Sequence, residues 1–149
     1  MSTSTIIELA DAVVVELNGA AAGTFSQSFT AKRYYVPVFD LKEMRDLHVS
    51  VVPVGVETTT ASRALLQHDV QLDVAVQQKF PQDTAVELEA IDDLMGLVQE
   101  ISDFLRAVGR FGDALWIKTE NKPVYSPEHM GQLRQFTSVL TLTLRILRA

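Results

Sequence analysis

Cysteine is absent from the 149 residues of this chain, and no apolar run is long enough to cross a bilayer. The lack of cysteine excludes disulfide frameworks, zinc-thiolate sites, iron–sulfur clusters and cysteine nucleophiles together. A membrane-spanning helix needs roughly 18 or more consecutive apolar residues, and the apolar N-terminal stretch is interrupted by Glu8, Asp11 and Glu16. We therefore expect a folded protein that has no membrane partner.

Basic residues are scarce: 13 Lys and Arg stand against 19 Asp and Glu, for a net charge of −6. This balance disfavours general nucleic-acid binding, which gains most of its affinity by neutralising phosphates. The charge is also uneven. Residues 1–103 hold six bases and sixteen acids, whereas residues 104–149 hold seven bases and three acids. Opposite signs on two parts of one domain favour head-to-tail self-association, although an ordinary charged surface has the same pattern.

Motifs that carry chemistry are missing as well. None of the three histidines, His48, His68 and His129, has a second histidine at ligand spacing. No G-x-S-x-G, H-E-x-x-H or glycine-rich phosphate loop is present, and the G-x-x-G at 109–112 follows a predicted helix instead of opening one. We therefore predict that the protein is not an enzyme and that it holds no cofactor and no metal.

The spacing of apolar residues predicts the secondary structure. Apolar residues recur at helical spacing after Thr5 and Glu8, which have the spacing of a capping box. Helices are predicted over about 5–19 and from Asp83 or Thr84 to Ala107, with a short helix beginning at Asp40. Alternating apolar and polar residues predict strands over 25–31, 48–52, 70–77, 115–117 and 138–147.

This order of elements predicts the fold class. Only one long helix lies between strands, which argues against a doubly wound α/β sheet. We predict one α+β domain over residues 1–149: a mainly antiparallel sheet of four to five strands, with two amphipathic helices packed on one face.

Two polar regions remain outside this scheme, and one helix is strongly acidic. The stretch 57–63 is predicted to be an exposed hairpin loop, and residues 119–135 are rich in turn-forming residues. Between Asp83 and Asp103 the chain carries seven acids and no base. Such a helix face is typical of a solvated surface, of a contact with a basic partner, or of a lining that must not hold DNA.

The order of particular segments resembles the tail-terminator (tail completion) proteins of long-tailed bacteriophages. The likeness rests on the helix Thr5–Asn18, the segment Leu47–Gly55, the strand His68–Phe80 leading into the acidic helix, and the closing segment Phe136–Ile146. These phage proteins are small α+β proteins of similar length, and the likeness of pattern covers nearly the whole chain.

The resemblance implies a structural role. Such proteins form a six-fold ring on the last disc of the tail tube, stop polymerisation of the tube and offer a surface for the head connector. The implied partners are copies of the chain itself in a hexamer, the tail tube protein and a head connector or neck protein, with DNA only in passage. The implied location is the neck region of the virion tail, after assembly in the host cytoplasm.

Two sets of residues are candidates for these contacts. The candidate interface lies in the two polar regions and comprises Glu57, Thr58, Thr59, Thr60, Arg63, Lys122, Tyr125 and His129. The candidate acidic face, which would line a channel or meet a neighbouring subunit, comprises Glu89, Asp93, Glu100 and Asp103.

Two alternatives remain open. The first is a head–tail connector or neck protein that joins heads to finished tails without limiting tail length. The second is a cytoplasmic enzyme or small-ligand-binding α+β domain, which requires a pocket with converging polar groups.

Overall fold

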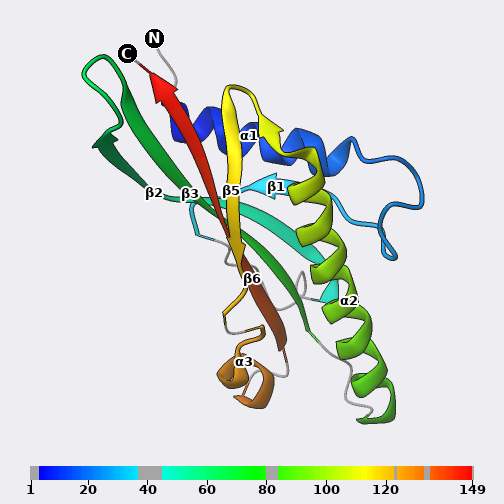
Figure 1. Cartoon of the computed structure of the whole chain (residues 1–149). Coiled ribbons are helices and arrows are strands. Elements are labelled where there is room, and N and C mark those ends of the chain that lie inside the picture. Colours follow the sequence, from blue (N-terminus) through cyan, green and yellow to red (C-terminus); the bar gives the residue numbers. More distant parts are fainter. Residues whose placement is uncertain (1–3, 37–44, 80–83, 123, 133–134, 149) are drawn as a thin grey trace.

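A computed structural model describes residues 4–36, 45–79, 84–122, 124–132 and 135–148 (Figure 1). Its elements are α1 (Thr5–Asn18), β1 (Ala31–Arg33), β2 (His48–Thr60), β3 (Leu66–Lys79), α2 (Thr84–Val108), β4 (Arg110–Phe111), β5 (Ala114–Glu120), α3 (Pro127–Gln132) and β6 (Gln135–Arg148). The α+β class is confirmed.

The strands form one mixed sheet in the order β1-β2-β3-β6-β5-β4. At its centre β3 and β6 pair antiparallel over their whole length, from Leu66 opposite Arg148 to Lys79 opposite Gln135. β2 and β5 flank this pair, also antiparallel. The short β1 runs parallel to β2. Long strands at the centre and short ones at the margins leave much of both sheet edges without a neighbouring strand in the described part of the chain.

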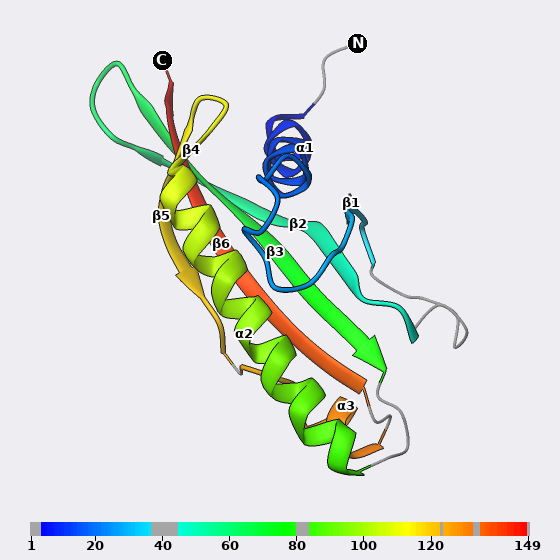
Figure 2. The same ribbon diagram turned by 90° about the vertical axis from the view of Figure 1, so that its right-hand side faces the viewer.

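The two long helices, α1 and α2, lie on the same face of the sheet (Figure 2). The hydrophobic core fills the space between these helices and the sheet. On β6 the alternate residues from Phe136 to Ile146 are buried beneath these helices, as are the alternate residues from Val70 to Val76 on β3. The helices contribute Leu9, Ala10, Val13 and Leu17 from α1, and Leu94, Leu97, Val98, Ile101 and Leu105 from α2. The period-two pattern of the strands therefore separates a covered face from an open face.

The prediction of four to five strands and two helices is wrong in detail: the described residues form six strands and three helices. The predicted strand 25–31 is wrong apart from its last residue, since β1 covers Ala31–Arg33 and residues 25–30 form no strand. The rings of Phe25 and Phe29 pack on each other at 5.1 Å between centroids, and Phe25 also packs on Phe104 at 5.3 Å. An aromatic cluster beside α2 produced the same alternation as a strand.

β2 is longer than predicted, since it continues through Pro53 and Gly55 to Thr60. An irregularity between Pro53 and Gly55 shifts the register against β3, and this bulge accommodates the proline that was expected to end the strand. The predicted loop 57–63 is therefore mostly strand, with its turn at residues 61–64.

α1 begins at Thr5 as predicted, but the residue that caps it lies one position earlier than the predicted capping box. Ser4, and not Thr5, is the N-cap, and its hydroxyl accepts a hydrogen bond from the N–H of Ile7 at 3.4 Å. Most of the short helix predicted from Asp40 lies outside the described residues.

We predict that Leu142→Ala lowers the free energy of unfolding by about 2–5 kcal/mol, because it leaves a cavity in the core. Leu142 is fully buried at the centre of β6. The matched control is Leu147→Ala on the same strand, whose side chain is 53% exposed and which should change stability by only about 0.5 kcal/mol. Urea unfolding of both variants measures this, and equal losses would contradict the assignment of the two faces.

Candidate interaction surfaces

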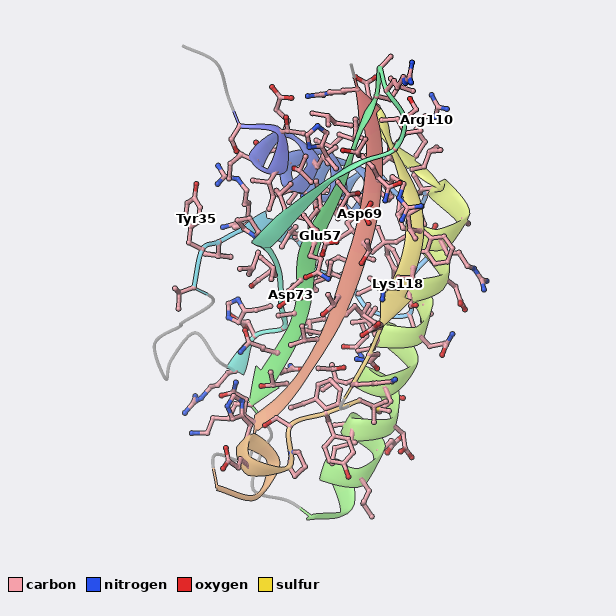
Figure 3. The ribbon with its side chains drawn as sticks, turned by 60° about the vertical axis from the view of Figure 1, so that its left-hand side comes forward. Tyr35, Glu57, Asp69, Asp73, Arg110 and Lys118 are labelled. Carbon is pink, nitrogen blue, oxygen red and sulfur yellow. The ribbon has the colours of Figure 1, made fainter. Side chains whose placement is uncertain are left out.

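The face of the sheet that α1 and α2 leave uncovered, here called the open face, is mainly polar (Figure 3). The strand register arranges its side chains in rows that cross four strands. One row holds Gly55, Gln71, Thr143 and Lys118, and the next row toward the β2–β3 turn holds Glu57, Asp69, Arg145 and Leu115. Figure 3 shows Glu57, Asp69, Asp73 and Lys118 gathered over the middle of this face.

The charged row contains one strong ion pair. The Arg145 guanidinium donates from Nε to Asp69 Oδ1 at 2.8 Å and from Nη2 to Asp69 Oδ2 at 3.2 Å. These bonds hold the pKa of the Asp69 carboxyl below its usual value. Glu57 lies directly opposite Asp69 and forms no ion pair among the described residues. This row therefore has two carboxylates and one cation, with Glu57 left unneutralised.

Between these two rows the open face is hollowed. The polar hollow has a volume of about 390 Å³ and is lined by Gly55, Val56, Glu57, Asp69, Gln71, Lys118 and Thr143. The Thr143 side chain is nearly buried there, and its hydroxyl has no hydrogen-bond partner within the described structure. Lys118 donates to Glu120 at 2.8 Å. The lining is thus polar and carries both signs of charge.

The first open sheet edge belongs to β2. β1 pairs only with Val49–Val51, and the last bond on that side joins the N–H of Tyr34 to the carbonyl of Val51 at 2.9 Å. From Val52 to Thr60 the outer edge of β2 has no neighbouring strand in the described structure. We call this stretch the β2 edge. Its nine residues include no lysine, and Pro53 with the bulge beside it protects only the first part of the stretch, so the part from Gly55 to Thr60 can accept another strand.

An apolar groove runs beside the β2 edge. It has a volume of about 600 Å³ and is lined by Ser4, Ile6, Ile7, Tyr35, Pro53, Val54, Gly55 and Val56. Val54 and Val56 are each about half exposed there, at 51% and 50%. An exposed strand edge beside exposed aliphatic side chains is the arrangement that proteins use to bind by strand addition.

The second open edge belongs to β5, on the other side of the sheet. β4 pairs only with Ala114 and Leu115, and the N–H of Trp116 donates to Gly109 at 2.9 Å. The remaining stretch from Ile117 to Glu120, here called the β5 edge, has no outer neighbouring strand within the described ranges. In Figure 3 the labels of Tyr35 and Arg110 mark these two opposite sides of the sheet.

The predicted interface residues divide between the two ends of the molecule (Figure 1). Glu57, Thr58, Thr59, Thr60 and Arg63 are exposed on the β2–β3 hairpin. Lys122, Tyr125 and His129 precede or belong to α3, at the far end of the sheet. The structure therefore does not bring the two halves of this set together in one subunit.

His129 is held in place by hydrogen bonds inside the subunit. Its Nδ1 lies 2.8 Å from the Thr137 hydroxyl, and its N–H donates to Ser126 Oγ at 3.3 Å. These bonds fasten α3 to the open-face side of β6. Lys122 and Tyr125 are the exposed members of this group.

The four acids of α2 differ in their surroundings. Glu89 and Asp93 are exposed. Glu100 Oε2 accepts a hydrogen bond from the N–H of Ser26 at 2.7 Å, which ties the loop before β1 to the helix. Asp103 accepts a bond from Gln99 at 3.0 Å and lies 3.6 Å from Arg106. Glu89 and Asp93 are thus the members whose carboxylates are free of such bonds in the described structure.

Sequence reasoning missed Lys118, Val54, Val56 and both open edges. The alternation of Val52, Val54 and Val56 was a signal that β2 continues beyond Pro53. Nothing in the sequence around Lys118 indicates which side chains it lies beside in the sheet, because its neighbours depend on how β5 pairs with β6.

No family model matches the chain, and a search of curated proteins gives no significant match. Within the described residues, no three His, Asp or Glu side chains gather as a metal site would require. No helix in that part of the chain is long and apolar enough to cross a membrane. The surfaces above are therefore the features from which function can be argued.

We predict that the stabilising effect of Asp69 is lost at acid pH. Because Arg145 lowers the pKa of Asp69 in the folded state, the ion pair stabilises the fold above the unfolded-state pKa of about 3.9 and ceases to do so as the pH falls through the folded-state pKa. Asp69→Asn should therefore be less stable than the wild type at neutral pH, and the difference should shrink in acid.

Urea unfolding of both proteins at neutral and acid pH measures this. Glu57→Gln is the matched control, because it removes a like charge opposite Asp69 and should leave neutral-pH stability unchanged or slightly raised. A difference for Asp69→Asn that persists undiminished in acid would contradict the assigned ion pair.

We also predict that Glu100→Ala lowers the free energy of unfolding by about 1 kcal/mol, since Ser26 loses its hydrogen-bond acceptor. The control is Glu89→Ala, at an exposed position of the same helix, with an expected change within ~0.5 kcal/mol. Amide exchange at Ser26 should quicken only in the first variant. If Glu89→Ala costs as much, the loss of a carboxylate from α2 and not the loop contact is responsible.

Proposed function

We propose that this protein is a tail-terminator (tail completion) subunit of a long-tailed bacteriophage. In this role copies of the chain close the end of the tail tube as a ring, with six subunits expected, stop tube polymerisation and present a surface for head joining. The role is structural and includes no enzymatic step. The proposal begins from the resemblance in the order of segments and is supported by the arrangement of open edges.

The observation that carries the proposal is the pair of open edges on opposite sides of one sheet. When two different surfaces of a subunit meet in successive copies, the contact is heterologous and generates either a closed ring or a filament. A tail terminator requires the closed form. The surplus of acids before residue 104 and of bases after it fits the same head-to-tail contact.

The remaining surfaces fit the other partners of this role. The exposed residues Lys122 and Tyr125 lie at one end of the sheet and the β2–β3 hairpin at the other, so one end of a ring would meet the tail tube protein and the other the head connector or neck protein. Glu89 and Asp93 on α2 are the acids available to line a channel, where they would repel DNA in passage. The subunit would reside in the neck of the virion, after assembly in the host cytoplasm.

The test is removal of the gene from the phage genome that encodes the chain, followed by electron microscopy of the resulting particles. A terminator subunit is needed to stop growth of the tube, so we expect overlong tails without heads. Supplying the wild-type gene on a plasmid is the control and should restore tails of normal length.

Two other outcomes contradict the proposal. Tails of normal length beside separate filled heads would assign the chain to a connector without length control. Intact infectious particles would exclude both structural roles. In that case a thermal-shift screen with metabolites would test the polar hollow as a small-ligand site, because a ligand at a hundredfold excess over its Kd raises stability by about 2.7 kcal/mol.

A further inference from the structure

We infer that the β2 edge of one subunit pairs with the β5 edge of the next, so that the sheet continues from copy to copy. This inference rests on the proposed ring and names its subunit contact. The occupant of the β2 edge is thus a second copy of this chain.

The strand directions fix how these edges meet. Each step from β2 through β3 and β6 to β5 is antiparallel, so β5 runs opposite to β2 within one subunit. If the next copy is added in the same orientation, its strands keep these directions and its open face lies beside the open face of the first copy. The β5 edge of the next copy therefore meets the β2 edge in antiparallel fashion, and alternate residues of the two strands share a face.

Charge then selects the register. Glu57 and Lys118 both point to the open face, and Glu57 is the carboxylate of its row without a cation among the described residues. Placing Lys118 of the next copy opposite Glu57 puts Thr119 opposite Val56 and Glu120 opposite Gly55. Gly55 has no side chain, and the space above its Cα is open, so Glu120 and its bond to Lys118 are accommodated. Cross-strand pairs of opposite charge stabilise a sheet.

The same charges disfavour a two-fold contact between two β2 edges. Full antiparallel overlap of two stretches 52–60 centres on Val56, so the Glu57 side chains of both copies lie on the same face at diagonal positions, about 7–8 Å apart. Each copy also brings Asp69 to the position beside Glu57. The stretch 52–60 has no basic residue to offset this repulsion, whereas the β5 edge supplies Lys118.

The apolar groove adds an apolar contact for the incoming strand. It lies along the β2 edge and exposes Val54 and Val56, which the side chains of an added strand would cover. Apolar burial gives affinity, and the backbone bonds and the charge pair give register.

The outer side of β1 is closed to strand addition at Ala31. The Ala31 N–H donates to Asn18 Oδ1 at 2.8 Å, and the Asn18 Nδ2 donates to the Ala31 carbonyl at 2.9 Å, so neither backbone group is available to another strand.

The chain has no cysteine, so engineered cysteines report this contact without interference. Val56→Cys and Thr119→Cys are made in separate chains, mixed and oxidised, both as concentrated purified protein and in phage particles that contain both variants. We expect a disulfide-linked heterodimer to form several-fold faster than with Val15→Cys in place of Val56→Cys. Val15 is a matched control, since it is an exposed valine on α1 that belongs to neither edge and does not line the apolar groove.

The charge pair is tested with the same cysteines. Glu57→Lys in the Val56→Cys chain, or Lys118→Glu in the Thr119→Cys chain, should slow cross-linking, and combining the two should restore it. Unfolding curves of all variants check that each is folded.

A dominant homodimer of Val56→Cys would overturn the inference in favour of a two-fold contact. Absence of the heterodimer from both purified protein and particles would also overturn it. Particles with normal tails and no cross-link would refute this contact while leaving the terminator role intact. A heterodimer of purified chains, with intact particles after gene removal, would support the contact and refute the role.

Discussion

The antiparallel pairing of β3 with β6 is the interaction on which the rest of this structure depends. The two strands match residue for residue over fourteen positions. That register sends one alternate set of side chains beneath α1 and α2 and the other set to the open face. A slip of β6 by one residue against β3 would turn its side chains over, so that its leucines would face water while the aliphatic side chains of β3 remained beneath the helices. The ion pair between Asp69 and Arg145 and the bond from Thr141 to Asp73 lie across the same pairing on the open face.

The fold was predictable where local periodicity and tertiary packing agree. The alternation around Leu140 and Leu142 and the apolar stripe of α2 describe a buried strand face and a buried helix face, which is what these elements have. Prediction failed where a tertiary contact imitates or overrides a local pattern. Phe25 and Phe29 imitate a strand because their rings pack on each other and Phe25 packs on Phe104. A bulge lets β2 continue past Pro53, although proline there indicates an end.

The candidate site was predictable only in part, for a related reason. The exposure of Glu57–Thr60 follows from a polar composition that a sequence displays directly. An open edge is a different kind of property, because it depends on how far a neighbouring strand extends. β1 stops at Arg33 and β4 at Phe111, and neither end is marked by a residue near the edge that it leaves open. The polar hollow likewise joins Glu57, Thr143 and Lys118, which are brought together only by the register of four strands.

The position of β6 in the chain has a consequence for biosynthesis. Ribosomes make β2 and β3 early, but the partner that covers the inner edge of β3 is the last strand of the sheet to be made. Until β6 emerges, the nascent hairpin exposes aliphatic residues from Val70 to Val76 together with both of its edges. Pairings between segments so distant in sequence form slowly because a large loop must close first. The fold is therefore completed after translation has passed residue 135, and during that interval the chain is most exposed to aggregation.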